Sequence, residues 1–410
     1  MEVLGRRREG HRTTSLHGGV GCPARAVRLV RLEVHGRRER TTETSATAHA
    51  QTQVGPRPRL VGLDAARALA IIGMVVVNVG PTNAETVLER LYLLPFGRAS
   101  VLFVTIAGLG MGFFLRRRSG RALWSPLAWR VLLLLAVGLA LQSTTQTVSV
   151  ILPTYAVLFL LAPLLWRMPT RWLVALTLVV TVAGPALLVR YDITHLGIED
   201  QGPSLGTPPD EALRSLLITG PYPLLSWTVP FVVGVILSRV DLTSTALVRR
   251  LAVWGGVAAV GAFVVATTAT ALLGPRADRG WPRLLTGVAH GQMPLWLVSA
   301  TGGAVLVIAA CLLLGRRLGR LMSGLAVMGT YALTLYVLHV LVLAVVKPDE
   351  GLGSFIAGAG VSAGLLALLV LVVVLWERTG LPGPLEWVLR HPWLRPPPPV
   401  EHPTAQETPR

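Results

Sequence analysis

The feature that most restricts the fold of this 410-residue chain is a series of apolar runs of about 20 residues. A helix of that length is what a hydrocarbon core of about 30 Å requires. The runs predict about ten transmembrane helices, at residues 60–81, 96–115, 129–145, 147–166, 171–190, 221–238, 249–273, 293–314, 325–346 and 355–376.

The composition agrees with an integral membrane protein, because 52% of the residues are hydrophobic, 14% are charged, and mean hydropathy is +0.58. The longest connection between predicted spans runs from Arg190 to Gly220, which leaves no room for a soluble domain of ordinary size after Arg59. We therefore expect an all-α, polytopic membrane helical bundle over residues 60–378. We expect it to be a multi-pass protein in the lipid bilayer of the cell membrane.

The segments outside the predicted bundle have no periodic apolar pattern. Residues 1–59 are rich in Arg, Thr, Gly and His and lack the apolar core of a signal peptide, so we expect a disordered basic tail. A start codon assigned too far upstream is the alternative explanation for this stretch. Residues 379–410 include four consecutive prolines at Pro396–Pro399, which predicts an irregular, Pro-rich tail.

The net charge of +17 is distributed as membrane topology requires, so we expect no nucleic-acid partner. Alternate connections are basic, and those between them are richer in acid. The basic connections contain Arg116, Arg117, Arg118, Arg121, Arg130, Arg167, Arg171, Arg239, Arg249, Arg250, Arg316, Arg317 and Arg320. The positive-inside rule places these connections and both chain termini in the cytoplasm.

One connection departs from that charge pattern. The seventh, with Arg276, Arg279 and Arg283, is basic although it is predicted to face outward. It is either a local exception to a statistical rule or a contact for anionic lipid or substrate.

Familiar metal and nucleotide motifs do not occur in the sequence. Cys22 lies in the N-terminal tail and Cys311 in a predicted span, so no disulfide framework or CxxC pair is available. No histidine has a partner of the HExxH kind, and no phosphate loop, dinucleotide fingerprint or nucleophile elbow is present. We expect no metal site and no tightly bound cofactor.

Polar residues within or beside the predicted spans form the candidate site, because a charge at bilayer depth costs roughly 2.5–3.5 kcal/mol. The direction of each span places Asn78, Arg98, His290 and His339 near the outer face. Each has a structural alternative, namely interhelical bonding for Asn78 and His339, snorkelling for Arg98 and an ordinary loop position for His290. Their shared depth favours a site open to the outside.

Asp64 and Arg67 lie at the opposite, cytoplasmic end of the first span. They are three residues apart and can meet on one helical face, so a purely structural ion pair is the alternative to a site role. Polar groups at both ends of the bundle fit a substrate that enters from outside and a donor that enters from inside.

Two early segments carry a family resemblance. The stretches RLVGLDAARALAIIGMVVVNVGP at Arg59–Pro81 and GRASVLFVTIAGLGMGFFLRR at Gly97–Arg117 resemble the start of the catalytic domain of heparan-alpha-glucosaminide N-acetyltransferases. Later segments resemble the YeiB-type bacterial membrane proteins of the same broad group, namely ILPTYAVLFLLAPLL, GPYPLLSWTVPFVVGVILSRVDL, YALTLYVLH and GPLEWVLR. The resemblance extends over about residues 59–390.

The resemblance implies transmembrane acyl transfer, in which cytoplasmic acyl-CoA donates to an amine or hydroxyl of an extracytoplasmic sugar or glycan. Such a reaction needs a base for the acceptor's proton, and we expect His339 or His290 to serve. Asn78 and Arg98 are expected to bind the acceptor or the developing oxyanion. Asp64 with Arg67 is expected to order the first helix near the donor entrance.

The sequence departs from the acetyltransferase pattern in one place. Those enzymes have a catalytic histidine in the first outer connection, whereas Pro81–Pro95 contains none and Asn78 stands at the junction. Two alternatives therefore stay open: a transporter or flippase of a small polar solute or lipid, and a noncatalytic membrane protein of the same fold. A homo-oligomer is compatible with all three functions.

Overall fold

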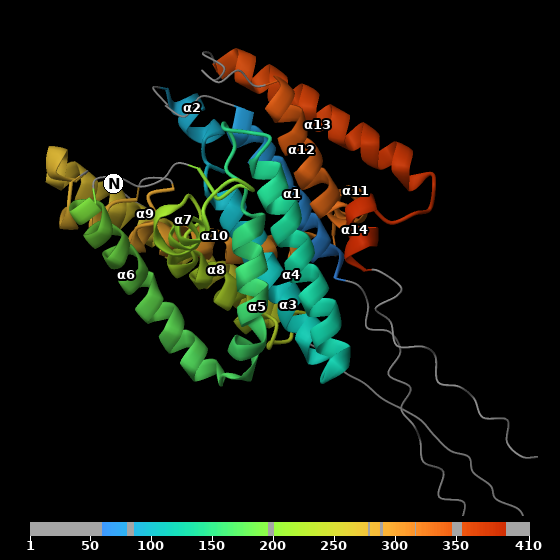
Figure 1. Ribbon diagram of the computed structural model, residues 1–410, viewed down its shortest axis with the longest axis horizontal. Coiled ribbons are helices and arrows are strands. Elements are labelled where there is room, and N and C mark those ends of the chain that lie inside the picture. The colour runs from blue at the N-terminus through green and yellow to red at the C-terminus, as the bar shows by residue number, and fades with distance from the viewer. Residues whose placement is uncertain are drawn as a thin grey trace, which may run out of the picture. The chain divides into compact units, whose positions relative to one another are not determined.

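The computed structural model describes residues 60–79, 86–195, 201–277, 279–287, 290–315, 317–346 and 355–390. Within these ranges all regular structure is helical and no strand occurs, which confirms the predicted all-α fold (Figure 1). The predicted N-terminal tail at residues 1–59 lies outside the described residues, as do residues 391–410.

Among the described residues, seven helices are long and apolar enough to cross a membrane, as expected of a multi-pass membrane protein. They are α1 (Val61–Val79), α3 (Arg98–Arg116), α4 (Arg121–Gln142), α6 (Thr170–His195), α9 (Thr245–Leu273), α10 (Pro294–Leu314) and α13 (Phe355–Glu377). The expected span at 147–166 corresponds to α5 (Leu152–Arg167), which has only 16 residues. Two bent helix pairs raise the number of candidate spans from seven to nine, against the ten expected.

The first bent pair leads into α8 (Leu224–Leu237), which is too short to be a span by itself. It is preceded by α7 (Pro209–Arg214) and the π-helical turn η1 (Ser215–Thr219), and the two parts meet at 60°. Pro221 and Pro223 stand at the bend, where neither can donate a backbone hydrogen bond.

The second bent pair corrects our expectation of one continuous helix at residues 325–346. α11 (Gly319–Thr330) and α12 (Ala332–Val346) meet at 72°, with Tyr331 between them. A break inside an apolar span leaves backbone N–H groups that need other acceptors. Those acceptors come from a side chain distant in sequence, which apolar periodicity does not reveal.

The centre of the bundle is formed by α1, α3, α8 and α10, whose side chains are mostly buried. α6, α9 and α13 lie at the periphery (Figure 1) and expose large apolar residues such as Leu178, Trp254 and Leu371. Apolar side chains at the surface of so many helices indicate contact with lipid.

Glycines let the central helices approach backbone to backbone. A Cβ atom at Gly234 of α8 would lie 2.0 Å from the carbonyl oxygen of Thr105 on α3, and one at Gly108 would lie 2.1 Å from the carbonyl oxygen of Phe231. Gly329 of α11 packs equally tightly on α1, at the carbonyl oxygen of Asp64. Small residues at helix crossings are the usual means of close packing in membranes.

The basic seventh connection contains the short helices η2 (Gly274–Arg276) and η3 (Trp281–Leu285). Arg283 of η3 forms an ion pair with Asp192 near the end of α6. One of the three arginines that departed from the charge pattern is therefore neutralised within the fold.

Two more short helices complete the chain. α2 (Val87–Tyr92) begins with a capping box between Thr86 and Glu89. α14 (Pro384–Leu389) lies in the segment for which we expected irregular structure, and it packs against α12 and α4. The C-terminal segment thus contributes a helix to the bundle before the described residues end.

Candidate functional site

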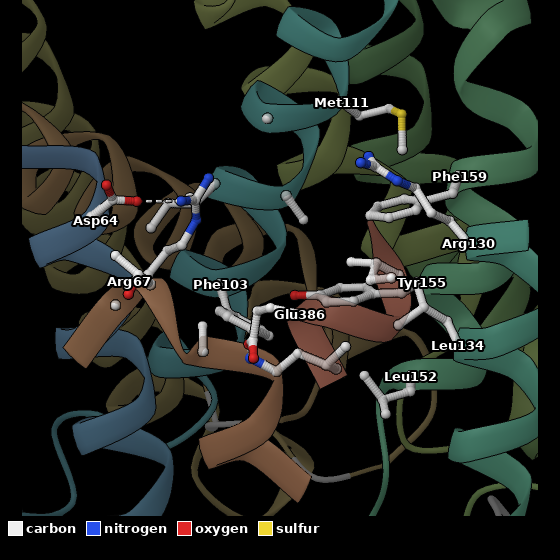
Figure 2. Close-up of a pocket in the computed structure, with 18 of the residues that line it drawn as sticks. Asp64, Arg67, Phe103, Met111, Arg130, Leu134, Leu152, Tyr155, Phe159 and Glu386 are labelled. Carbon is white, nitrogen blue, oxygen red and sulfur yellow. Dashed lines mark hydrogen bonds and ion pairs between the residues drawn. The ribbon is translucent and has the colours of Figure 1, made fainter. Parts of the chain in front are cut away.

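A cavity of about 280 Å³ lies among the helices of the bundle (Figure 2). Its lining includes Asp64, Arg67 and Arg130, which the sequence analysis placed toward the predicted cytoplasmic end. Its walls come from α1, α3, α4, α5, the α11–α12 break and α14. Asp64 and Arg67 line one wall, Arg130 and Tyr155 line the opposite wall, and Glu386 lies between them in Figure 2. Of the six residues predicted from the sequence, only Asp64 and Arg67 line this cavity.

The predicted pair on α1 is formed as its spacing suggested. Arg67 Nη1 donates to Asp64 Oδ1 at 2.5 Å, across one turn of helix. The Asp64 residue is buried, and its backbone is in contact with Gly329 of α11. The ion pair therefore joins two neighbouring turns at the start of α1, beside the cavity.

The opposite wall holds two residues that the sequence analysis missed. The Arg130 guanidinium lies 4.3 Å from the centre of the Phe114 ring, and its buried Nε atom makes no hydrogen bond within the described part of the chain. Tyr155 is buried, and its hydroxyl also has no partner among the described residues. The sequence analysis used Arg130 only as one of the basic residues that indicate membrane topology, and it treated Tyr155 only as part of the apolar segment at residues 151–165.

Glu386 is the third residue that the sequence analysis missed, and it explains the break between α11 and α12. Its carboxylate accepts from the backbone N–H groups of Leu333 at 2.7 Å and Thr334 at 3.1 Å, and from the Thr334 hydroxyl at 2.5 Å. Trp129 Nε1 also donates to the Val388 carbonyl oxygen at 2.8 Å, which ties α14 to α4. Proline followed by an acid two positions later is a helix-start signal that could have revealed α14.

At the other end of α1, the structure brings Asn78 and His339 together. Asn78 Nδ2 lies 3.3 Å from His339 Nε2, although the two residues are 261 positions apart in sequence. His339 is fully buried, and its Nδ1 lies 3.3 Å from the Leu335 carbonyl oxygen. If Nδ1 carries the proton for Leu335, then Nε2 accepts from the Asn78 amide; this tautomer is assigned from the contacts.

A column of aromatic rings separates the cavity from His339. The ring centres are 5.6 Å apart for Tyr155 and Phe103, 6.2 Å for Phe103 and Tyr336, and 5.1 Å for Tyr336 and His339. Tyr155 and Phe103 line the cavity. The candidate base therefore lies beyond the cavity wall, one tyrosine ring past Phe103.

His290 lies apart from that pair, in an aromatic cluster with Phe96, Tyr222, Trp227 and Trp296. Its backbone is in the left-handed region, with φ of 57°, a conformation that is strained for a residue with a side chain. Burial lowers the pKa of His290 to about 4, so its ring is neutral at pH 7.

Arg98 begins α3 and lies over the Phe263 ring of α9, with its Cζ atom 5.9 Å from the ring centre. The four outer residues thus contact different neighbours: Asn78 and His339 contact each other, His290 contacts the aromatic cluster, and Arg98 contacts α9. The sequence predicts a shared depth for the four residues, and within the described part of the chain these contacts join only Asn78 to His339.

Residues 238–394 match the model of a family described as "Protein of unknown function (DUF418)". The match begins just after α8 and includes α9 to α14, so His290, His339 and Glu386 lie inside it, whereas α1 and α3 precede it. No curated protein matches the chain. The protein is thus a multi-pass helical membrane protein that carries a DUF418 domain.

Proposed function

We propose that this protein is a membrane acyltransferase, which moves an acyl group from cytoplasmic acyl-CoA to an amine or hydroxyl of an extracytoplasmic sugar or glycan. The cell membrane is its proposed location, and acyl-CoA is a substrate rather than a resident cofactor. The observation that carries the proposal is the partly buried contact between Asn78 and His339, because it joins a candidate base to an amide at the predicted outer half of the bundle. The resemblance of residues 59–81 and 97–117 to the start of the catalytic domain of membrane acetyltransferases supports the same reaction.

The proposed chemistry uses the pair as base and hydrogen-bond donor. The acceptor's nitrogen or oxygen forms a bond to the acyl carbon, the carbon–sulfur bond breaks, and CoA leaves as the thiolate. His339 Nε2 takes the acceptor's proton once the acceptor replaces the Asn78 amide as its hydrogen-bond partner, and the proton then passes to the thiolate. The Asn78 N–H, released from the histidine, donates to the oxyanion. Arg98 and His290 remain candidates for binding the acceptor and for the base.

The donor is proposed to enter through the cavity beside Asp64 and Arg67. The cavity volume of about 280 Å³ is just below the range of about 300–1,000 Å³ typical of sites for drug-sized ligands. It therefore holds only the end of an acyl-CoA molecule. Along α1, the fourteen residues from Asp64 to Asn78 span about 21 Å. The acyl group reaches His339 only if Phe103 and Tyr336 change rotamer.

Purified protein, radiolabelled acyl-CoA of several chain lengths and a panel of amino sugars and glycans test the proposal. We expect an acylated product that requires all three components. His339→Gln should lower the rate by about 10²–10⁴-fold, the usual contribution of a general base. Thr267→Val is the matched control, because within the described part of the chain the exposed Thr267 hydroxyl bonds only to backbone carbonyl groups of its own helix, α9. Absence of any acyl-CoA-dependent product, or full activity of the His339→Gln, His290→Gln double variant, would contradict the proposal.

A transporter or flippase is the second candidate, and the two bent helix pairs favour it. Transporters build substrate sites from interrupted helices, and the α11–α12 break lines the cavity through Thr330, Ala332 and Leu333. This function predicts movement of a polar solute or lipid headgroup in proteoliposomes without acyl-CoA. The transporter function would be favoured over acyl transfer by two results together. Transport should survive His339→Gln, and it should be abolished when Tyr331→Cys is crosslinked to a second engineered cysteine nearby, which fixes the helix break.

A further inference from the structure

We propose that the cavity lined by Asp64, Arg67 and Arg130 is a binding site for the phosphate group of a ligand that arrives from the predicted cytoplasmic side, with Arg130 and the Tyr155 hydroxyl as its principal contacts. Binding of this kind does not require that an acyl group be transferred. The site could therefore be occupied even if the protein is not an acyltransferase.

The charges that line the cavity leave a positive excess. Asp64 is paired with Arg67, and the Glu386 carboxylate is engaged by the first turn of α12. Arg130 and Arg390 also line the cavity, and neither forms an ion pair within the described part of the chain. An anion from outside the chain would supply the missing negative charge at this partly desolvated position.

Two hydrogen-bond donors on adjacent helices, from residues that line the cavity, have no acceptor within the part of the chain that the structure describes. One is Nε of Arg130 on α4, and the other is the hydroxyl of Tyr155 on α5. Tyr155 is only 4% exposed, and its hydroxyl has no partner among the described residues. A buried polar group without a partner destabilises the folded state, and a ligand that supplies the partner removes that cost. A site that needs two acceptor atoms and negative charge fits a phosphate group, which offers three acceptor oxygens.

The Arg130 side chain is already held in place for such a ligand. Its guanidinium lies 4.3 Å from the centre of the Phe114 ring, and Arg118 lies 4.5 Å from the same centre. A guanidinium stacked on an aromatic ring keeps its N–H edges free for a planar or tetrahedral anion. Holding Arg130 beforehand reduces the entropy lost on binding.

The cavity volume limits which part of the ligand can enter. About 280 Å³ is just below the range typical of sites for drug-sized ligands, which suits a phosphate group with a few attached atoms better than a whole nucleotide or phospholipid. A phosphorylated soluble molecule and an anionic lipid both present this chemistry. The two sources differ in where the rest of the ligand lies, in the aqueous phase or in the membrane.

Thermal unfolding of the protein in neutral detergent, titrated with inorganic phosphate and then pyrophosphate at constant ionic strength, tests the proposal. Ligand that binds only the folded state raises the unfolding temperature as its concentration passes the dissociation constant. Arg130→Gln should weaken the apparent affinity at least tenfold, since hydrogen bonds to charged groups contribute about 1.5–3 kcal/mol. Tyr155→Phe should weaken the apparent affinity severalfold. This variant removes only a hydroxyl, so it keeps the test available if Arg130→Gln does not fold.

Arg249→Gln is the matched control, because Arg249 is exposed on α9 and does not line the cavity. We expect its response to phosphate to equal that of the wild type. Native mass spectrometry from nanodiscs of phosphatidylglycerol or phosphatidylcholine separates the two sources. Phosphatidylglycerol retained by the wild type but lost from Arg130→Gln would assign the site to a lipid headgroup, and a phosphate response without retained lipid would assign it to a soluble ligand.

Equal phosphate responses in the wild type, Arg130→Gln and Tyr155→Phe, together with equal lipid retention, would overturn the proposal. These measurements follow binding without turnover. The phosphate-binding result would therefore stand even if no acyl transfer were detected in the enzyme assay. Conversely, failure to bind phosphate would not by itself refute acyl transfer.

Discussion

Glu386 provides a sharp test of how the broken span is stabilised. Glu386→Ala removes the acceptor for the N–H groups of Leu333 and Thr334 and for the Thr334 hydroxyl. Each backbone N–H left without an acceptor costs about 1–3 kcal/mol. Water that enters the cavity offsets part of this cost, so we expect a loss of about 3 kcal/mol in the local stability of the first turn of α12.

Hydrogen–deuterium exchange measures this local loss. A change of about 3 kcal/mol corresponds to roughly a hundredfold increase in opening, because every 1.4 kcal/mol is tenfold. We expect faster exchange in a peptide that covers Leu333 and Thr334, while α1 and α3 keep their protection. Glu377→Ala is the control, because Glu377 is an exposed acid at the end of α13.

The outcome that would refute this reasoning is unchanged exchange at Leu333 and Thr334 in Glu386→Ala, or the same increase in Glu377→Ala. If Glu386→Ala does not fold, Glu386→Gln takes its place. The glutamine keeps one carbonyl oxygen as acceptor, so its effect should be smaller, at roughly tenfold.

Three further predictions concern packing, the buried pair and pH. Gly329→Ala should destabilise the protein by about 1–3 kcal/mol or more in chemical unfolding, since its Cβ would lie 1.8 Å from the Asp64 carbonyl oxygen. Gly324→Ala on the same helix is the control, and it should be neutral or slightly stabilising because its Cβ meets open space. A double-mutant cycle of Asn78→Leu and His339→Leu should give a coupling energy of about 0.6–1.7 kcal/mol, and zero coupling would show that the 3.3 Å contact contributes nothing. Burial lowers the pKa of His290 to about 4, so the free energy of unfolding should be constant above about pH 6.5 and fall by at most about 3 kcal/mol between pH 6.5 and pH 4. The fall should be smaller in His290→Asn, because asparagine tolerates the same positive φ. Thermal unfolding at pH 7.5 and pH 5 measures the difference, and equal pH responses in the two proteins would contradict the prediction.

The positions of the membrane helices could be predicted because each is written in a contiguous stretch of apolar residues. The observed bounds of α1, α3, α10 and α13 differ by only a few residues from the expected ones. The 72° bend at Tyr331 could not be predicted in this way, since residues on both sides are apolar and the acceptors for the freed N–H groups come from Glu386.

The candidate site was predicted only in part, for a similar reason. Spacing along one helix was enough to pair Asp64 with Arg67, and depth was enough to place Asn78 and His339 at the same end of the bundle. Depth does not define position around the bundle, so the separation of His290 and Arg98 from that pair was not visible. Arg130 and Tyr155 gained significance only through their shared cavity and their missing partners.

The sequence by itself thus determined that the chain is a helical membrane protein, because the energy of placing backbone and side chains in lipid depends on local composition. It also indicated which end is basic and which residues carry an unusual cost in the membrane. Only the tertiary structure decided where the cavity lies, which polar groups satisfy one another and which remain without partners. Hydrogen bonds and charge pairing act over a few ångströms in space, and residues that meet there, such as Asn78 and His339, can be hundreds of positions apart in the chain.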